Sequence, residues 1–388
     1  MISIKQQPYN YTPAFNDIIF QIESNYNNIQ YFLVSVLNAR NEVVLSNLKL
    51  YSTPVNRRAA TINLTQIVRN NVSTSVVNTN NFVEYFEDTF AYKFIIVEYL
   101  FSNNQTVSGE VFYSNVFYAY NGYVEQHKFS EYKNDYYKTY WLTNKPLISN
   151  TTADAMEWLY YFNANEVEHA VITLSYVDRG ANTVIPLNRS YTNGRLNISL
   201  PALVAAGINI NGLRWFSVEL TKNNTDLGAS YWPVTGKIIR RIQPVNCNTT
   251  TVNLIFENQH GGMDTISLLN PTENLNVIRN TIKVNPYSII DGVYTNQTGG
   301  IYNHTDRIIS TTSESEYTVV SDYVSNEVAA WMPELVKSKK VLLVLPSGRL
   351  LPVKMIDTNL KIQTTKYSSG MNQYTFRFTA ESNIKFQV

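Results

Sequence analysis

The stretch KFIIVEYLFSNN, residues 93–104, decides the fold of the first part of the chain. It is a run of β-branched and aromatic residues that ends at an Asn-Asn pair. Such residues favour a half-buried strand, and Asn favours a turn. A glycine and a second strand-like run, GEVFYS, follow at 109–114. The stretch therefore predicts two strands joined by a turn.

The same order of features returns later in the chain. RWFSVELTKNN, residues 214–224, also ends at Asn-Asn and is followed by a glycine and an aromatic run. Aligning the two stretches from their first basic residues pairs Phe94 with Trp215 and Val97 with Val218. This alignment predicts that the two stretches are the same strand in two copies of one unit.

Three further matches lie upstream of this pair, in the same order in both halves. In INLTQIV and its match ISLPALV a strand runs into a short helical turn, where Thr65 can cap the helix and Pro201 suits its first turn. The matched ranges are 62–68 with 198–204, 32–37 with 170–175, and 18–24 with 158–164. The order predicts two tandem β-sandwich domains, at 1–120 and 121–245, with an aromatic insertion at 126–150 in the second.

Residues 246–388 have a different pattern. The segment 321–338 is the one convincing helix of the sequence, because Val324, Val328, Trp331 and Leu335 recur at helical spacing. Pro333 should kink or split it. Strand-like runs surround it, so we expect a smaller α+β domain with one helix on a mostly antiparallel sheet. The whole chain is expected to be mainly β.

Composition excludes several classes of protein. The chain has 388 residues, of which 44% are apolar and 16% charged, and its net charge is +1. A neutral chain without Lys/Arg runs argues against nucleic acid and anionic membranes as partners. The N-terminal residues lack the apolar core of a signal peptide, and the longest apolar runs have only the length of a strand. We therefore expect a soluble protein made in a cytoplasm.

The sequence predicts no enzyme, cofactor or metal site. IFENQHGGMDTISLL, residues 255–269, places His260 beside two glycines between strand-like runs, which favours a turn over a catalytic loop. Cys247 is the single cysteine and lies in no motif. The acidic clusters at 84–88 and 314–316 could serve a glycoside hydrolase, but solvated carboxylates are the simpler interpretation.

The segment 132–141 is the candidate interaction site. It is rich in aromatic residues that could stack on sugar rings or anchor a protein interface, and we favour the interface. The candidate interface residues are Tyr136, Tyr137, Tyr140 and Trp141.

Three stretches together resemble virion structural proteins of tailed phages that infect Bacteroidetes, including the crAss-like group. They are QQPYNYTPAFNDIIF near the N-terminus, LIFENQHGGMDTISL, and the run from MPELVKSKKVLLV through LLPVKMID to YTFRFTAES. The C-terminal pattern of a helix followed by a sheet is similar to tail-tube and baseplate-type domains. The resemblance brings no catalytic residues with it.

The resemblance implies a tail, ring or hub component, or a connector near the portal, located in the virion. Its expected partners are copies of itself in a ring and other tail or portal-associated proteins. An alternative is a carbohydrate-binding or receptor-binding adhesin module, which depends on the aromatic segment 132–141.

Overall fold

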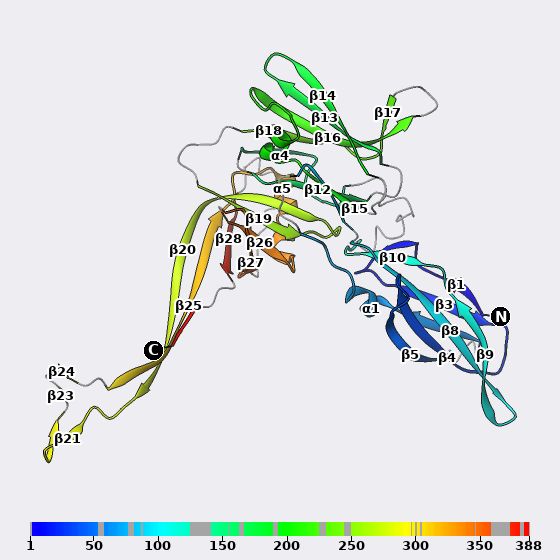
Figure 1. Ribbon diagram of the computed structural model, residues 1–388, viewed down its shortest axis with the longest axis horizontal. Coiled ribbons are helices and arrows are strands. Elements are labelled where there is room, and N and C mark those ends of the chain that lie inside the picture. The colour runs from blue at the N-terminus through cyan, green and yellow to red at the C-terminus, as the bar shows by residue number, and fades with distance from the viewer. Residues whose placement is uncertain are drawn as a thin grey trace.

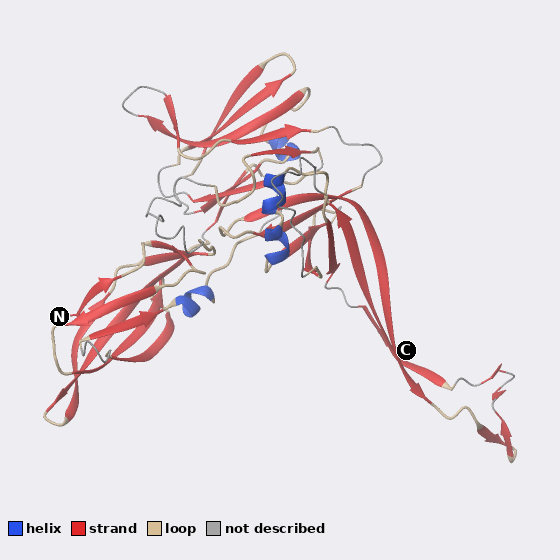
Figure 2. Cartoon of the chain, turned by 180° about the vertical axis from the view of Figure 1, so that it is seen from behind, coloured by secondary structure: helices blue, strands red, loops and turns tan. Residues whose placement is uncertain are grey.

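The computed structural model describes residues 2–52, 58–76, 81–86, 88–124, 141–153, 155–162, 167–188, 193–224, 230–243, 250–295, 297–298, 301–302, 305–345, 347–357, 373–380 and 384–387. The chain is mainly β, with 59% strand and 7% helix, in several antiparallel and mixed sheets. A central mass carries two projections that point in different directions, one formed by the N-terminal unit and the other by strands β20 and β25 (Figure 1; Figure 2).

The first unit contains two sheets that share one hydrophobic core. The smaller sheet has the order β1-β3-β6, and the larger has the order β2-β10-β8-β4-β5 with β9 also paired to β8. The pairing of β2 with β10 is parallel and the others are antiparallel. The strands are β1 (Ile2–Gln6), β2 (Tyr11–Pro13), β3 (Ile19–Ser24), β4 (Ile29–Asn38), β5 (Val43–Tyr51), β6 (Ala59–Asn63), β8 (Phe90–Ser102), β9 (Gln105–Tyr113) and β10 (Phe117–Tyr120).

Local sequence accounts for the turns of this unit. Asn103 and Asn104 have φ of 51° and 58°, as the expected turn requires. The helical turn after β6 is α1 (Thr65–Arg69), but the expected cap is wrong. Thr65 is the first helical residue, and its Oγ1 instead accepts a hydrogen bond from Ile18 N at 2.8 Å.

The second unit has a larger sheet of order β11-β18-β16-β13-β14, with β17 also paired to β16. Its smaller sheet is β12-β15-β7, and α4 (Leu200–Ala205) follows β15 with Pro201 in its first turn. Strand β7 comes from residues before β8, so the first half of the chain donates a strand to the second unit. The strands are β7 (Val83–Phe86), β11 (Ile148–Thr151), β12 (Trp158–Phe162), β13 (His169–Tyr176), β14 (Gly180–Pro186), β15 (Asn193–Asn197), β16 (Leu213–Asn224), β17 (Ser230–Pro233) and β18 (Ile238–Ile242).

The two larger sheets have the same strand order, and their central strand pairs, β4 with β8 and β13 with β16, have matching registers. Val34 pairs with Ile96 between β4 and β8, and Ile172 pairs with Val218 between β13 and β16; all four are buried. Position 96 of the first unit therefore corresponds to position 218 of the second unit. The sequence alignment instead pairs position 97 with position 218.

The sequence alignment of Phe94 with Trp215 is wrong by one residue. Phe94 is buried, whereas Trp215 is half-buried on the opposite face of its sheet, and the equivalent of Phe94 is Phe216. Strand side chains alternate between faces, so a slip of one residue exchanges the core face for the outer face. The slip was not visible in the sequence, because the two stretches also match in residue type when they are offset by one residue.

The C-terminal unit is a closed barrel. Strands β20-β19-β26-β27-β28-β25 pair in this order, and an additional pairing of β20 with β25 closes the ring, with all of these pairings antiparallel. Closure leaves no free edge among the described strands of the ring. The strands are β19 (Thr251–Glu257), β20 (Met263–Lys283), β25 (Asp306–Val320), β26 (Val341–Val344), β27 (Leu350–Met355) and β28 (Thr375–Ala380), and β29 (Ile384–Gln387) pairs with β25 outside the ring.

The expected helix is present in two parts, as Pro333 predicted. They are α5 (Asn326–Trp331) and α6 (Pro333–Lys337). Trp331 packs on Phe256 of β19 with ring centroids 5.5 Å apart. The expected single helix on a mostly antiparallel sheet is therefore a pair of short helices packed against antiparallel strands that close into a barrel.

Beyond the barrel, β20 and β25 continue as a two-stranded arm (Figure 1). The arm is residues 270–283 paired with 306–318, and 14 strand residues span about 45 Å. Past it the described chain forms the small hairpins β21 (Ser288–Ile290) with β22 (Val293–Thr295), and β23 (Gln297–Thr298) with β24 (Ile301–Tyr302).

Candidate functional site

The three units meet at one hydrophobic junction. Tyr120 ends the first unit, β12 belongs to the second, and the outward face of β19 and β26 belongs to the barrel. The buried residues of the junction are Phe86, Tyr120, Leu142, Trp158, Tyr160, Phe162, Ile255, Met263 and Leu342. Ile255 faces this junction while its neighbours Leu254 and Phe256 face the barrel core, so both faces of β19 are buried. Burial of this kind holds the units in one arrangement.

The donated strand β7 is fixed by a buried cation. Arg195 of β15 has a fully buried side chain, forms an ion pair with Glu84 of β7, and lies 3.7 Å over the Trp158 ring. Burial raises the pKa of Glu84, and the Arg195 charge opposes that rise. The guanidinium forms a charge-assisted contact with the carboxylate and a cation–π contact with the indole face, and both favour the pairing of β7 with β15.

A second buried ion network lies between the second unit and the barrel. Glu157 Oε1 accepts from Arg240 Nε at 2.5 Å and from Lys145 Nζ at 2.8 Å. Lys145 Nζ also donates to the Thr265 carbonyl of β20 at 3.2 Å. Burial raises the pKa of Glu157, but Arg240 and Lys145 outweigh it and leave the pKa below its usual value. Burial also lowers the pKa of Lys145.

The segment around His260 is the turn that the sequence predicted. Asn258 organises it, because its Oδ1 accepts from the backbone N of His260 at 2.9 Å and of Gly262 at 3.0 Å. Its Nδ2 donates to the Leu142 carbonyl at 2.6 Å and to Asp264 Oδ1 at 2.9 Å. The turn therefore ties the barrel to the second unit.

Gly261 shows why this turn needs glycine. Its φ is 89°, and a Cβ at this position would lie 1.9 Å from the Asn121 carbonyl oxygen. The Gly261 carbonyl accepts from Thr74 Oγ1 at 3.0 Å, and Tyr123 N donates to Gln259 O at 2.7 Å. The turn thus lies in backbone contact with the first unit and its linker.

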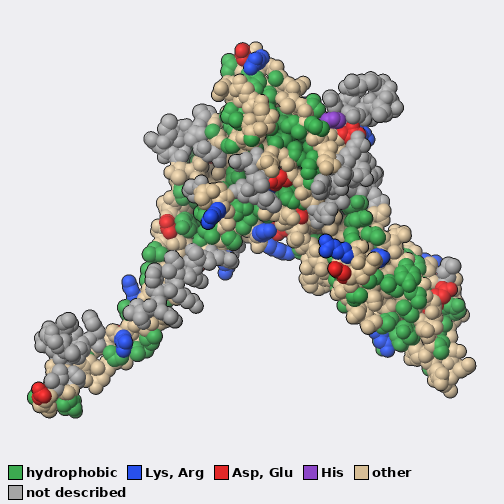
Figure 3. Space-filling view, viewed as in Figure 1, with side chains coloured by type: hydrophobic (Ala, Val, Ile, Leu, Met, Phe, Trp, Pro, Cys, Tyr) green, Lys and Arg blue, Asp and Glu red, His purple; other side chains and the backbone are tan. Residues whose placement is uncertain are grey.

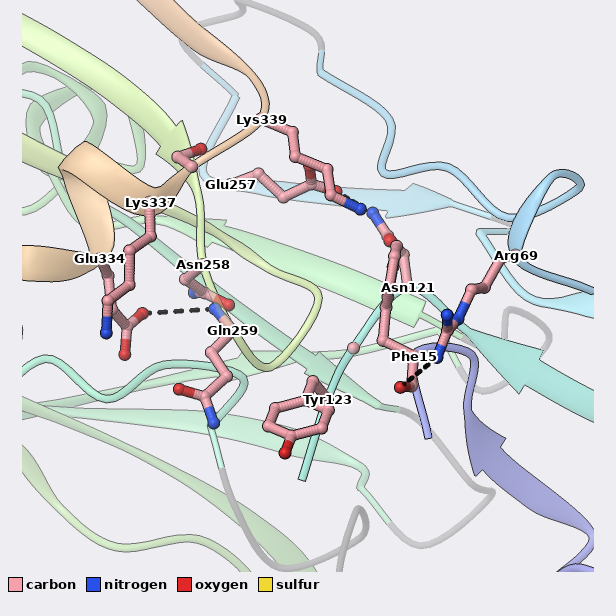
Figure 4. Close-up of a pocket in the computed structure, with 12 residues that line it drawn as sticks. Phe15, Arg69, Asn121, Tyr123, Glu257, Asn258, Gln259, Glu334, Lys337 and Lys339 are labelled. Carbon is pink, nitrogen blue, oxygen red and sulfur yellow. Dashed lines mark hydrogen bonds between the residues drawn. The ribbon is translucent and has the colours of Figure 1, made fainter. Parts of the chain in front are cut away.

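A cavity of about 580 Å³ opens at the same junction (Figure 4). Arg69 lines it from the first unit and donates to the Phe15 carbonyl at 2.7 Å, and Lys339 lies 3.7 Å over the Phe15 ring. Glu334 of α6 accepts from Gln259 N at 3.3 Å. Of these contacts, the one between Lys339 and the Phe15 ring crosses between the barrel and the first unit, so it helps to hold the two units together.

The carboxylates of the cavity are partly buried. Burial raises the pKa of Glu334, which also accepts a hydrogen bond from Asn144. Burial raises the pKa of Glu257 as well, against the opposing charges of Lys340 and Lys339. Asn121 of the linker donates to Glu257. Both acids are held in contacts that connect the units.

The aromatic candidates are not brought together on a described surface. Trp141 is 5% exposed, its Nε1 donates to the Gly236 carbonyl at 2.8 Å, and its ring packs edge-on against Tyr161. The aromatic pattern of 132–141 predicted a contact surface for this side chain, whereas the structure places it in the core of the second unit. Tyr136, Tyr137 and Tyr140 lie outside the described residues.

The sequence contains three other histidines and one cysteine. His169 is on β13, and Cys247, His127 and His304 lie outside the described residues. Among the residues that the structure describes, no group of three or more His, Cys, Asp or Glu could hold a metal ion. In the same residues no helix has both the length and the apolar character needed to span a membrane.

Sequence reasoning missed the arm. Its exposed apolar side chains include Leu275 at 62% and Ile278 at 62% exposure, and Tyr294 in the hairpin beyond it at 76%. Residues 274–283, NLNVIRNTIK, mix apolar residues with Asn, Thr and basic residues, and no interpretation of this segment was made from the sequence. The residues around the segment predict a strand, but they do not show that the strand extends beyond the barrel and stays exposed.

No protein-family model matches the chain, and no curated protein matches it. The fold and the junction therefore carry the functional argument.

Proposed function

We propose that this chain is a structural subunit of a tailed-phage particle, a component of its tail, hub or portal-proximal connector that assembles with copies of itself into a ring. The observation that carries the proposal is the arm formed by β20 and β25. A two-stranded ribbon is marginally stable on its own, and this one exposes several large apolar side chains along its length. A partner surface would bury them.

The junction supports the same proposal. Three units are joined by a buried hydrophobic cluster, by the donated strand β7 and by two buried ionic contacts. A subunit that transmits force within a particle benefits from units that do not rotate against each other. The resemblance to virion structural proteins of Bacteroidetes phages points in the same direction.

We also propose that the first and second units are tandem copies of one β-sandwich. The shared strand order, the parallel first strand in each larger sheet, and a short helix after β6 and after β15 support this. Duplicated sheets give one chain two related surfaces, which suits a building block that contacts several neighbours.

The adhesin alternative now has less support, because Trp141 is buried and its indole N–H is occupied within the second unit. It would depend on aromatic residues of the segment 132–140, which lie outside the described residues.

Native mass spectrometry with negative-stain imaging of the full chain tests the proposal. Measurements are made on the chain alone over a range of concentrations and after mixing with extracts of assembled particles. Closed rings or incorporation into tails is the expected result. A chain that stays monomeric and never enters particles would contradict the proposal.

A further inference from the structure

The smaller sheets of the first and second units share a pair of equivalent strands. β6 pairs with β3, and β15 pairs with β12, and both pairings are antiparallel. Leu64 N donates to the Ile18 carbonyl at 2.9 Å, and Ile198 N donates to the Glu157 carbonyl at 2.8 Å. The two hydrogen bonds occupy the same place, directly after the last residue of β6 and of β15, so β6 corresponds to β15.

The passage from strand to helix supports this correspondence. Asn63 Oδ1 accepts a hydrogen bond from Thr65 N at 3.0 Å. Asn197 Oδ1 accepts one from Ser199 N at 3.2 Å. The last residue of each strand therefore closes the same turn before the short helix, and Asn63 corresponds to Asn197.

The outer edge of β15 is occupied by β7. The two strands pair antiparallel, and Asn197 N donates to the Phe82 carbonyl at 2.8 Å. Arg195 lies opposite Glu84 in the same register. Because β7 lies in the sequence between α1 and β8, the second unit completes its smaller sheet with a strand from outside itself.

The outer edge of β6 is open in the part of the chain that the structure describes. β6 ends its sheet, with β3 as its neighbour on the other side. In an antiparallel pair, residues bonded to the partner strand alternate with residues whose backbone groups point away from it. Leu64 bonds toward β3, so the backbone N–H and C=O of Asn63 and Thr61 point away from β3. Both of these residues are exposed. Such an edge can pair with a further strand.

No described strand takes the place of β7 in the first unit. β5 comes close to β6 on this side of the sandwich, but no pairing connects the two strands. The first unit also stands clear of the central mass, so another protein can approach its surface (Figure 2; Figure 3).

We propose that the outer edge of β6 accepts an extended segment of a different protein, which adds to the smaller sheet as an antiparallel strand in the way that β7 adds to β15. Every strand that the structure describes already pairs with another strand, so a second copy could donate one only by breaking its own sheet. The choice of a neighbouring protein as donor rests on the proposed function, because a subunit of a particle contacts other proteins. In strand addition, main-chain hydrogen bonds give affinity and alternate side chains give specificity.

β7 shows which side chains the added segment carries. Val83 packs against the core of the second unit, and the next residue, Glu84, forms an ion pair with the buried Arg195. In the first unit the position of Arg195 is taken by Thr61, which is exposed. We therefore expect apolar residues where the segment faces the core and uncharged polar residues between them.

A tethered strand tests the edge on the chain by itself. The sequence TVTYT keeps the residue types of Val83 and Tyr85 at the inward positions and is fused to the N-terminus through about eight Gly and Ser residues. An antiparallel strand on β6 would end level with the start of β1, because Ile2 lies opposite Ser24 and the start of β6 follows at the same end of β3. Three spacings of about 4.8 Å separate the two positions, roughly 14 Å. A linker of this length spans roughly 16 Å on average, so the tether can reach.

Hydrogen exchange at single-residue resolution measures the outcome. In the chain without a tether, the amides of Thr61 and Asn63 should exchange at least about tenfold faster than those of Arg195 and Asn197, which pair with β7. The TVTYT tether should slow Thr61 and Asn63 about tenfold or more. A matched control tether, PVPYP, keeps the inward residues but lacks the N–H groups that would face β6, and should leave both rates unchanged.

Two results would overturn the proposal on the isolated chain. Exchange at Thr61 as slow as at Arg195 in the untethered chain would show that the edge is already covered. A TVTYT tether that leaves Thr61 and Asn63 unprotected would show that the edge does not accept a strand.

Photo-crosslinking from position 61 identifies the donor. Benzoylphenylalanine in place of Thr61 should crosslink to a peptide of a different protein in extracts of assembled particles. A crosslink to another copy of this chain, or the absence of any crosslink in assembled particles, would overturn the proposal. A chain that never enters particles contradicts the proposed function instead, and the tether experiment still decides whether the edge of β6 accepts a strand.

Discussion

Replacing Gly261 with alanine should uncouple the barrel from the first unit. Two costs coincide at this residue. The φ of 89° is a left-handed conformation, and the new Cβ would lie 1.9 Å from the Asn121 carbonyl oxygen. Gly207 offers a control, because its φ is 82° and a Cβ there would have no atom within 4 Å. The difference between the two variants isolates the close backbone contact.

The structure sets the size of that difference. Backbone strain of a non-glycine residue at positive φ costs about 1–2 kcal/mol, and both variants incur it. A real Cβ contact is at least 3.0 Å, so in Gly261→Ala the two backbones must separate by about 1 Å. The hydrogen bonds from Thr74 to Gly261 and from Tyr123 to Gln259 would then stretch from 3.0 Å and 2.7 Å to near 4 Å. Losing both adds about 2 kcal/mol.

Urea denaturation and hydrogen–deuterium exchange measure this. Gly261→Ala should lose about 3–4 kcal/mol of unfolding free energy, compared with about 1–2 kcal/mol for Gly207→Ala. Exchange should accelerate in the peptides around 117–124 and 255–265 only in the first variant. Equal loss of stability in the two variants, with unchanged exchange at the junction, would refute the inference that the close contact between Gly261 and Asn121 stabilises the junction with the first unit.

Three further predictions concern the buried polar and aromatic groups. Arg240→Met leaves the Glu157 carboxylate without its main partner, so we expect a loss of about 3–5 kcal/mol in urea denaturation, and a neutral result would count against the network. Because the pKa of Glu157 is below its ordinary value of 4.5 in the fold, its contribution is complete above that pH and is lost as the pH falls through the lower value. The stability difference between the wild type and Glu157→Gln should therefore shrink below about pH 4.5 in a pH series of unfolding temperatures, and a constant difference would contradict this assignment. Trp141→Ala should cost about 3–5 kcal/mol through the cavity it leaves in the second unit, whereas a surface residue would change stability little.

Local sequence was enough for several features of this protein. Strand runs of β-branched and aromatic residues became strands, the Asn103–Asn104 turn adopted positive φ, and Pro333 split the C-terminal helix. The glycines after His260 formed a turn between β19 and β20. Each of these depends on the conformational preferences of a few adjacent residues, which the sequence displays directly.

The candidate site needed more than local preference. Trp141 looks like a contact residue in sequence because it closes an aromatic segment, but the cavity that receives it is built by strands β12 and β18 and their loops. Glu84 looked like a solvated acid until β7 was seen to pair with β15, beside Arg195. The residues next to Trp141 and Glu84 in the sequence do not predict either contact, because the partners lie far away along the chain.

The sequence by itself determined the strand-rich composition, the turn positions, the split helix and the order of similar segments in the two halves. Tertiary structure alone decided the one-residue offset between Phe94 and Trp215, the donation of β7, the closure of the barrel and the exposure of the arm. The reason is physical: a strand shows which residues alternate, but its partner and its buried face depend on the free energy of contacts between segments far apart in the chain.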